Sequence, residues 1–435
     1  MEEKDLKKVR IALLGFGNIG KGVWQILNLN TSQILQRSGY EIKVTKILIK
    51  DINKKREIAL PDGVLTDDFE EIVNDDSIDI IVELIGGSDP ALDYMVRAMK
   101  NKKHVVTANK LCVATYNDIL FKTAREEEVF FYYEGSVGGG IPIIREIKES
   151  LTANKIQEIV GIINGTTNYI LTKMTEENMS FEEALKESQL KGYAEADPTD
   201  DIEGFDAAYK LSIISSLSFE TKVSPDTILR EGITKVKAID IKYAKKFGYV
   251  IKLLAIGRVS NGKIEVRVHP AFLPKTHNFA HITDSYNAVY IRGNAVGDLM
   301  LYGKGAGDLP TGSAVVSDIL AILRNNMNYH AINHIKESGS NLLLKDQDEY
   351  ESQYYIRFNV KDKPGILGDL GTLLGKNNIS IYYVTQDIEN SESVQLVFMT
   401  HTCKYINIKN LLKDVECNSD INSIENIIRI ESLLD

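Results

Sequence analysis

The sequence predicts an α/β protein made of three parts: a parallel-sheet domain, a mixed α+β domain and a C-terminal ferredoxin-like (βαββαβ) module. Three observations support this fold class. Short β-branched runs alternate with helical patterns over residues 9–135, longer helical stretches follow up to residue 310, and a compact strand–helix pattern occurs twice after residue 352. The length of 435 residues also fits about three domains of ordinary size.

Five apolar runs in the first part are expected to form the parallel sheet. They are continuous rather than alternating, which is typical of strands covered by helices on both faces. Turn residues or helical stretches separate them. The expected strands are Val9–Leu14, Val44–Ile49, Ile78–Glu83, His104–Thr107 and Val129–Tyr133.

Longer helical patterns distinguish the second part. A last apolar-periodic helix is expected over Thr311–Asn326, opened by a Ser/Thr N-cap, and the polar segment after it is expected to be a linker. Before it the sequence predicts helices over Pro142–Leu151, Asn168–Met174, Phe181–Lys191 and Gly204–Phe219, and strands over Val250–Val259 and Ile264–Pro270.

The C-terminal part has the order strand, helix, strand, strand, helix, strand, which is that of a ferredoxin-like module. An Asp-Lys-Pro-Gly turn and a polar turn interrupt it. The expected elements are Tyr354–Val360, Ile366–Lys376, Ile379–Gln386, Val394–Thr400, Ile406–Val415 and Ile424–Ile430.

The composition predicts a cytoplasmic protein that binds neither nucleic acid nor a membrane. A net charge of −10 opposes the neutralisation of a phosphate backbone. No uncharged stretch approaches the roughly 20 residues that span a bilayer, and the charged N-terminus lacks the core of a signal peptide. Three cysteines without CxxC spacing make a disulfide framework and a structural zinc site improbable.

A glycine-rich turn with the order GxGxxG follows the first expected strand and leads directly into a helical pattern. The first glycine permits the tight turn, the second lets the backbone approach a pyrophosphate, and the third allows close packing of strand and helix. In this context the motif predicts a Rossmann-type dinucleotide-binding domain. It consists of Gly15, Phe16, Gly17, Asn18, Ile19 and Gly20.

The end of the second strand should contact the ribose of the dinucleotide. Lys50 and the basic cluster Lys54–Arg56 favour the 2′-phosphate of NADP, whereas Asp51 would suit the free 2′-hydroxyl of NAD. The basic cluster is equally compatible with a solvated loop. The sequence therefore leaves the choice between NADP and NAD open.

Lys110 follows the strand His104–Thr107, and ligands bind beyond the carboxyl ends of the strands in open α/β sheets. A lysine in that place can reach a substrate or the nicotinamide, although most lysines are simply exposed. Cys112 lies close by, but no histidine is placed to activate it, so a thiohemiacetal mechanism is disfavoured. The sequence also contains no Gly-x-Ser-x-Gly, HExxH or Walker lysine pattern.

The segment from Glu195 to Asp206 holds six acids in 12 residues and no base. This crowding predicts a cationic partner, either a substrate ammonium group or a metal ion, unless the segment is a solvated loop. Asp206 and Lys210 lie four positions apart on one helix, which then runs from Leu211 to Phe219 without a charge. Such a pair is usually a surface ion pair. At the head of a buried apolar stripe it indicates a desolvated lysine with a tunable pKa, suited to general acid/base catalysis.

Two further glycine-rich loops are candidates for ligand contact. Glu134–Pro142 contains three successive glycines and joins the first two parts of the chain, as a hinge, a nicotinamide contact or a carbonyl cage for a cation. Gly303–Gly307 leads into a helix and either closes over a ligand or turns the chain.

Taken together, these motifs resemble homoserine dehydrogenase with a C-terminal ACT regulatory domain, over nearly the whole chain. The family activity is the reversible, NAD(P)H-dependent reduction of L-aspartate 4-semialdehyde to L-homoserine, on the route to threonine, isoleucine and methionine. The resemblance implies a dinucleotide domain (1–135 with the helix 311–330), a catalytic and dimerisation domain (136–310), a linker (331–351) and an ACT domain (352–435). The matching stretches are Gly15–Gly20, Thr107–Lys110, Glu134–Pro142, Asn164–Leu171, Gly192–Lys210 and Gly303–Thr311.

Carried over by position, the resemblance implies that Lys210 gives the proton to the aldehyde oxygen while hydride is delivered, with Lys110 beside it. Glu195 and Asp206 would bind the substrate. The cofactor would contact the glycine-rich turn, Lys50, Gly86, Lys110 and Gly305; at Lys50, NADP-preferring members tend to carry arginine. A monovalent cation, usually taken to be sodium, would bind carbonyl oxygens of Glu134, Val137, Gly139 and Ile141.

The ACT resemblance implies an amino-acid effector close to the turn Asp362–Gly365 and the segment Asn378–Ser380. L-threonine is the end product to expect there. ACT modules usually pair side by side, so a homodimer or homotetramer is implied, and the alternative is a module that serves only assembly.

Two rival functions are weighed against this one. A non-catalytic amino-acid sensor on a Rossmann scaffold is disfavoured because Lys110, Lys210, Glu195 and Asp206 are all present. A phosphorylating semialdehyde dehydrogenase needs a cysteine nucleophile with a histidine base, which the sequence around Cys112 does not offer.

Overall fold

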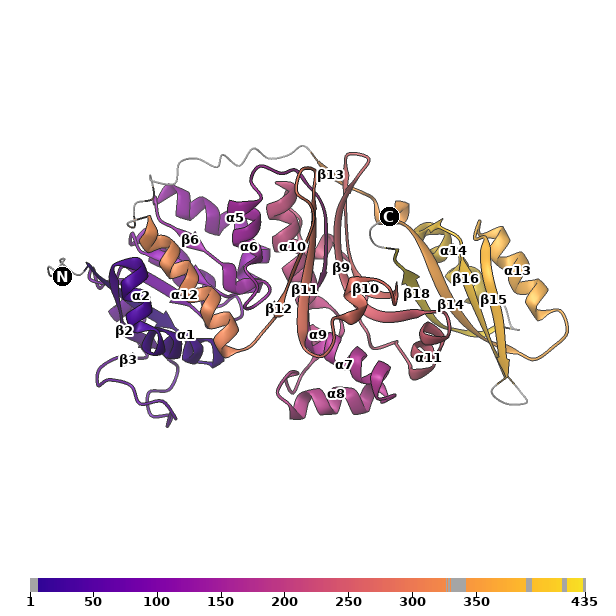
Figure 1. Cartoon of the computed structure of the whole chain (residues 1–435), viewed down its shortest axis with the longest axis horizontal. Coiled ribbons are helices and arrows are strands. Elements are labelled where there is room, and N and C mark those ends of the chain that lie inside the picture. The colour runs from indigo at the N-terminus through magenta and orange to yellow at the C-terminus, as the bar shows by residue number, and fades with distance from the viewer. Residues whose placement is uncertain are drawn as a thin grey trace. The chain divides into compact units, whose positions relative to one another are not determined.

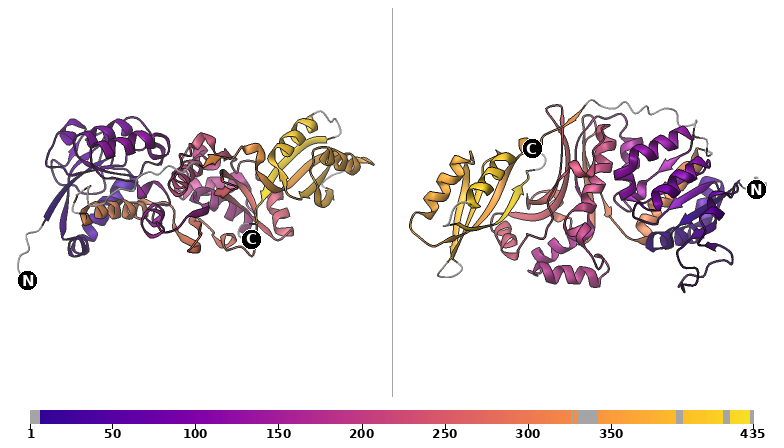
Figure 2. Two further views of the ribbon diagram at one scale, coloured as in Figure 1. Left: turned by 90° about the horizontal axis from the view of Figure 1, so that it is seen from above. Right: turned by 180° about the vertical axis from the view of Figure 1, so that it is seen from behind.

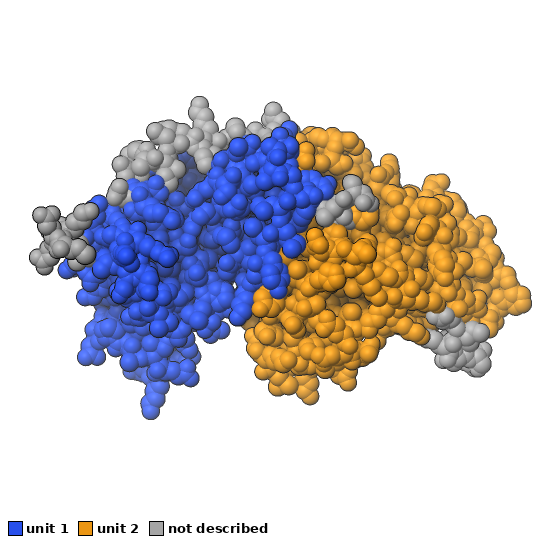
Figure 3. Space-filling view, viewed as in Figure 1, with its two compact units in different colours: residues 1–156, 209–227, 289–340 blue, residues 157–208, 228–288, 341–435 orange. Residues whose placement is uncertain are grey.

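A computed structural model describes residues 7–325, 327, 329, 342–388, 393–416 and 421–432 of the chain (Figure 1). Its contacts divide it into two compact units (Figure 3). Unit 1 comprises residues 1–156, 209–227 and 289–340, and unit 2 comprises residues 157–208, 228–288 and 341–435. Helix α10 (Phe205–Phe219) begins in unit 2 and continues in unit 1.

Unit 1 contains a six-stranded parallel sheet, which confirms the predicted fold class. Its order β3-β2-β1-β4-β5-β6 reverses direction at β1, and every adjacent pair is parallel. Helices cover both faces of this sheet (Figure 2). The strands are β1 (Lys7–Leu14), β2 (Tyr40–Leu48), β3 (Leu65–Thr66), β4 (Ile80–Glu83), β5 (His104–Thr107) and β6 (Phe131–Tyr132).

The helices of unit 1 differ from the expected ones in two places. The region expected as one helix over 142–151 is a short α6 followed by a π-helical turn, Glu146–Ser150. The last helix begins at Asp308, and its N-cap is Gly307, which has no side chain to accept a backbone N–H. The predicted Ser/Thr N-cap was therefore wrong, and Thr311 lies inside the helix. The α-helices are α1 (Asn18–Leu29), α2 (Thr31–Ser38), α3 (Glu70–Val73), α4 (Ala91–Lys100), α5 (Lys110–Glu126), α6 (Ile143–Arg145) and α12 (Asp308–Arg324).

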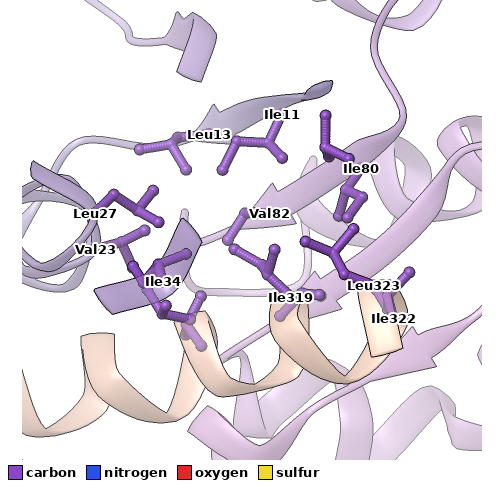
Figure 4. Packing of buried hydrophobic residues seen from close by; sticks show 14 of the residues in the cluster. Ile11, Leu13, Val23, Leu27, Ile34, Ile80, Val82, Ile319, Ile322 and Leu323 are labelled. Carbon is purple, nitrogen blue, oxygen red and sulfur yellow. The ribbon is translucent and has the colours of Figure 1, made fainter. Parts of the chain in front are cut away.

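Helix α12 returns to the parallel sheet and completes its core (Figure 4). Ile319, Ile322 and Leu323 belong to the same cluster of buried apolar side chains as Leu13 and Val82 of the sheet. The parallel-sheet domain is therefore completed by a segment far from it in the sequence. The hydrogen bond from the Glu134 N–H to Asp318, for example, joins residues 184 positions apart.

Two glycines let α12 approach helix α1 backbone to backbone. A Cβ at Gly22 would overlap the carbonyl of Asp308, and one at Gly312 would lie 2.8 Å from the carbonyl carbon of Gly22. The close approach fixes the N-terminal half of α12 beside the helix that the glycine-rich turn opens.

Unit 2 is a mixed α+β structure whose strands follow the order β7-β9-β10-β18-β14-β16-β15. Its helices are α7 (Gly165–Glu176), α8 (Phe181–Leu190), α9 (Thr199–Ile202), α11 (Ala238–Lys246), α13 (Ile366–Lys376) and α14 (Tyr405–Glu416). Its longer strands are β7 (Ile156–Ile162), β9 (Tyr249–Ser260), β10 (Lys263–Pro274), β14 (Glu351–Lys361), β15 (Ile381–Ile388), β16 (Ser393–Thr400) and β18 (Ile421–Ile430). Its short strands are β8 (Leu229–Arg230), β13 (Leu343–Leu344) and β17 (Cys403–Lys404). The hairpin strands β11 (Tyr286–Gly293) and β12 (Gly297–Lys304) follow β10 in the chain; β11 begins in unit 2, and β12 belongs to unit 1.

The C-terminal module has the predicted order β14-α13-β15-β16-α14-β18, and α13 begins and ends where the sequence places it. Both helices cover one face of its sheet (Figure 2). Strand β18 also pairs in parallel with β10, with Ala271 opposite Arg429. The module therefore extends the sheet of unit 2 instead of forming a separate body.

Part of the expected linker, residues 330–341, lies outside the described residues. The remainder is structured: β13 pairs with β10, and the N–H of Lys345 donates to the carbonyl of Ile264. A 3-10 turn, Gln347–Glu349, then leads into β14. From residue 342 onward the segment therefore pairs in part with β10, and this backbone pairing compensates for its polar side chains.

None of the helices in the described part of the chain is long and apolar enough to cross a bilayer.

Candidate active site

The glycine-rich turn has the geometry that a dinucleotide requires. Gly15 has φ of +107°, and a Cβ there would lie 2.8 Å from the carbonyl oxygen of Leu84. At Gly20 a Cβ would lie 2.6 Å from the carbonyl oxygen of Gly15, whereas at Gly17 it would meet nothing within 4 Å. Helix α1 starts at Asn18 with no side-chain cap and no acid in its first turn. The helix N-terminus and the open space at Gly17 fit a pyrophosphate.

Lys50 is exposed just beyond the end of β2. Arg56, one of the neighbouring bases, folds back and donates to the carbonyls of Asp51 and Lys54 at 2.8 and 2.7 Å. The Asp51 carboxylate accepts the N–H of Asn53 at 2.9 Å. Arg56 and Asp51 thus stabilise their own loop, which makes Lys50 the better candidate for contact with the ribose.

A buried carboxylate, Glu83, organises the ends of β4 and β5. It accepts the Thr107 hydroxyl at 2.6 Å and the N–H of Ile85 at 2.7 Å. Burial raises the pKa of Glu83, although these hydrogen bonds oppose the rise. Asn109 continues the network: it accepts the N–H of Cys112, capping α5, and donates to the carbonyl of Gly87 at 2.7 Å.

This network places Lys110 and the turn that contains Gly86. Lys110 is the first residue of α5 and is half-buried, and Gly86 has φ of +79°. Cys112 is buried, and burial raises its pKa to about 12, so its thiol stays protonated at neutral pH. This protonation removes the nucleophile that a phosphorylating semialdehyde dehydrogenase would need.

The two remaining glycine-rich loops lie against each other. The N–H of Gly140 donates to the carbonyl of Lys304 at 3.0 Å, and a Cβ at Gly139 would lie 2.6 Å from the carbonyl oxygen of Gly305. Gly138 and Gly139 both have positive φ, of +74° and +55°. The loop Glu134–Pro142 is therefore packed against the loop that contains Gly305.

Glu134 and Asp318 anchor this loop from inside the unit. The Glu134 carboxylate accepts the N–H groups of Ile144 and Arg145 at 2.8 and 2.7 Å, and its own N–H donates to Asp318 at 2.8 Å. Burial, together with the neighbouring charge of Glu134, raises the pKa of Asp318 to about 7. The loop that holds Val137 is therefore fixed by buried carboxylates.

In unit 2, Asn164 connects the α7 motif with the acidic segment. Its side-chain oxygen caps α7 by accepting the N–H of Thr167 at 2.8 Å. Its side-chain nitrogen donates to Asp206 at 2.8 Å and to Asp201 at 2.6 Å. Sequence reasoning gave no role to Asn164, although its position at the start of Asn164–Leu171 was the available signal.

The acids of the segment Glu195–Asp206 differ in their contacts. Asp197 accepts the hydroxyl and the N–H of Thr199, Glu203 accepts the hydroxyl of Thr234, and Glu195 is exposed. No group of three His, Cys, Asp or Glu side chains suited to a metal ion occurs among the residues described.

Helix α10 carries the predicted acid–base pair on its buried side. Asp206 is 2% exposed and Lys210, one turn later, is 9% exposed. Gly204, with φ of +80°, ends the preceding turn and lets α10 begin. An ion pair between Lys222 and Asp118 ties the segment after α10 to helix α5, which Lys110 opens.

Three family models match this chain. They are homoserine dehydrogenase over residues 142–320, the NAD-binding domain of homoserine dehydrogenase over residues 15–134, and the ACT domain over residues 354–416.

Similar proteins extend over the full length. The homoserine dehydrogenase of Neisseria gonorrhoeae is 39% identical and that of Bacillus subtilis 36%, with at least 98% of each chain covered. A crystal structure of a homoserine dehydrogenase from Thiobacillus denitrificans matches with a TM-score of 0.92 and 38% identity, covering 98% of this chain and 99% of that one. A hyperthermophilic archaeal homoserine dehydrogenase in complex with NADPH is 28% identical, with a TM-score of 0.59 over 72% of this chain and 97% of that one. With a nicotinamide-dinucleotide domain, a catalytic domain and an ACT domain all present, this chain belongs to the homoserine dehydrogenase family of oxidoreductases.

Proposed function

We propose that the chain interconverts L-aspartate 4-semialdehyde and L-homoserine with Lys210 as the group that gives and takes the proton. The observation that supports this most directly is the buried pair on α10, in which Asp206 is oriented by Asn164 and Lys210 follows one turn later. The dinucleotide would bind to residues 1–135 together with the helix 311–330. The catalytic domain, residues 136–310, would bind the substrate and form the dimer. A linker, residues 331–351, would join it to the ACT domain, residues 352–435, which would regulate the activity.

The nicotinamide, when bound, supplies the hydride in reduction and accepts it in oxidation. As the aldehyde oxygen gains negative charge, the ammonium group of Lys210 would give it a proton, which leaves a neutral amine and a hydroxyl group. Lys110 would orient the substrate and the nicotinamide. Glu195 and Asp206 would hold the substrate ammonium group, and the bond from Asn164 would keep the Asp206 carboxylate in one orientation.

The cofactor would be held by the turn Gly15–Gly20, with Lys50 at the ribose and Gly86, Lys110 and Gly305 around the nicotinamide end. An exposed lysine beyond β2 supports NADP over NAD, because it can pair with a 2′-phosphate. The neighbouring Asp51 is occupied within its own loop.

Two glycine substitutions should separate cofactor binding from folding. Gly17→Ala adds a methyl group in open space, so we expect an unchanged melting temperature with NADPH affinity reduced at least about tenfold, because the methyl group blocks the approach of the pyrophosphate. Gly20→Ala pushes a methyl group onto the Gly15 backbone and should lower the melting temperature itself. Thermal unfolding and NADPH fluorescence titration measure both. Undiminished NADPH binding by the folded Gly17→Ala variant would contradict this placement.

A monovalent cation would bind carbonyl oxygens of Glu134, Val137, Gly139 and Ile141. These oxygens belong to one buried loop, and the side chain of Glu134 is engaged by two backbone N–H groups. A set of neutral oxygen ligands suits a singly charged hard cation such as sodium. Its role would be to fix the loop that packs on Gly305.

The ACT domain would bind L-threonine beside the turn Asp362–Gly365 and the segment Asn378–Ser380, and inhibit the enzyme. Pairing of such modules supports a homodimer or homotetramer. A substitution tests the effector better than a truncation, because β18 pairs with β10 and Glu431 pairs with the buried Arg267. Asp362→Ala, an exposed position, leaves those contacts intact.

An absorbance assay at 340 nm tests the function. L-homoserine would be oxidised by NADP and by NAD in separate reactions, with sodium or lithium chloride and with or without L-threonine. We expect homoserine-dependent reduction of both cofactors, faster with NADP, and inhibition by L-threonine that Asp362→Ala weakens. Folded protein that reduces neither cofactor would instead favour an amino-acid sensor. Activity without any threonine effect would limit the module to assembly.

A further inference from the structure

One arginine of strand β8 holds the segment that leads into helix α10. Arg230 donates to the carbonyl of Glu203, and its guanidinium lies over the ring of Phe205, with 3.4 Å between Cζ and the ring centroid. A Cβ at Gly204 would lie 3.5 Å from Cγ of Arg230. Arg230 therefore contacts Glu203 and Phe205 and lies beside Gly204, the three residues that directly precede Asp206.

Strand β8 is itself attached to strand β10. Arg230 stands opposite Val268 in parallel pairing, and the N–H of Glu231 donates to the Val268 carbonyl at 2.8 Å. Gly232 packs so closely that a Cβ would lie 2.6 Å from Cα of Glu203. The backbone of β8 and the segment before Asp206 therefore have no room to move independently.

The residue after Arg230 is paired with the C-terminal module. Nη1 of Arg429, on β18, donates to Glu231 at 2.7 Å, and the two side chains are 3% and 35% exposed. The Arg429 guanidinium also lies 5.0 Å from the ring centroid of Tyr405, on α14. A buried arginine of the module thus reaches the loop beside β8.

We propose that Arg230 is a positioning residue for the Asp206 carboxylate and that the Glu231–Arg429 ion pair couples the ACT domain to that carboxylate. The proposal rests on the proposed role of Asp206 in substrate binding. The contacts run without a gap from β18 to Glu231, through Arg230, to the residues before Asp206. Because Asn164 fixes one carboxylate oxygen, a displaced α10 start would turn the carboxylate away from a substrate ammonium group. Coupling of this kind is reciprocal, so bound substrate would also stabilise one arrangement of the module.

Steady-state kinetics of the full-length protein test the positioning role. Arg230→Met removes the donor to Glu203, and we expect KM for L-homoserine to rise about tenfold or more, with kcat and KM for NADP nearly unchanged. Arg230→Lys keeps a charged donor and should recover most of the loss. A purely structural role would lower the stability and kcat and would raise both KM values together.

Glu231→Gln tests the coupling, because this residue faces the module. We expect a severalfold rise in KM for L-homoserine and faster hydrogen exchange of the amides at 203–208. Lys237→Met is the matched control: Lys237 forms an ion pair with Glu425 of β18 at 2.9 Å, so it also joins the module to unit 2, but it lies on a different segment. The control should change neither quantity.

An unchanged KM for L-homoserine in Arg230→Met overturns the positioning role. Equal effects of Glu231→Gln and Lys237→Met overturn the coupling, since any loosening of the module would then suffice. If Arg230→Met fails to fold, Glu231→Gln decides, and a wild-type KM for L-homoserine in that variant rejects the proposal. Wild-type protein without homoserine-dependent activity rejects the proposed function instead, and the exchange rates at 203–208 then report on the coupling alone.

Discussion

Lys210→Ala is expected to lower kcat for L-homoserine oxidation by about 10²–10⁴-fold while leaving NADPH affinity unchanged. The substitution removes the only group that we assign to proton transfer, so the hydroxyl proton has no acceptor as the hydride leaves. The pyrophosphate turn at residues 15–20 is untouched, which explains the unchanged affinity. Turnover assays and NADPH fluorescence titration of the same preparation measure the two quantities.

Two further variants make this expectation decisive. Lys210→Arg retains the positive charge and most of the volume, yet it should remain slow because a guanidinium does not release its proton near neutral pH. Lys222→Ala is the matched control. It also removes a lysine, one that lies shortly after the same helix, and the ion pair of Lys222 with Asp118 is exposed. Near-normal kcat in folded Lys210→Ala would exclude this residue as the proton carrier.

Arg357→Met is expected to destabilise the protein by about 3–5 kcal/mol. Asp240 is 0% exposed and Arg357 is 2% exposed, and Nε of the arginine donates to the carboxylate at 2.8 Å. Tyr355 and Asn426 donate to the same carboxylate at 2.9 and 2.8 Å. These neutral donors do not balance the charge, so removing the arginine leaves an uncompensated carboxylate in the interior.

The denaturation midpoint in urea, read by circular dichroism, measures this loss. Arg292→Met is the control, because its ion pair with Asp298 is partly exposed, at 28% and 50%, and should contribute no more than about 1 kcal/mol. Adding Asp240→Asn to Arg357→Met removes the stranded charge and should recover part of the stability. Equal midpoints for Arg357→Met and Arg292→Met would show that the buried ion pair contributes no more to the free energy of unfolding than the Arg292–Asp298 pair does.

Local patterns predicted the elements with strong periodicity. Helix α13 begins and ends as expected because Pro364 and Gly365 set its start and an apolar stripe defines its length. The strand His104–Thr107 was placed correctly, because a β-branched run too short to form a helix is typical of a covered strand. Two-residue strands such as β13 carry no such signal, because partners distant in sequence decide whether they form.

The site was predicted less completely, because several of its supports depend on long-range contacts. Asn164 acquires its role only when folding brings it to Asp206, 42 positions later. Glu83 was recognised as the last residue of a strand, but its function emerges from Thr107 on the neighbouring strand. Arg230 belongs to a two-residue strand and had no signal at all. The side chains proposed to contact the ligand belong to sequence motifs, whereas the side chains that position them are brought together only when the chain folds.

The parallel pairing of β18 with β10 has a consequence for synthesis on the ribosome. Arg267 of β10 finds its buried partner Glu431 only 164 positions later, so this arginine emerges long before the carboxylate exists. Until β18 has been synthesised, Ala271 and Phe272 of β10 lack their strand partner, and Arg267 has the carboxylate of Glu265 but not that of Glu431. The nascent chain therefore cannot complete unit 2 before β18 has been synthesised, and a chain truncated within β18 should yield an aggregating product rather than an unregulated enzyme.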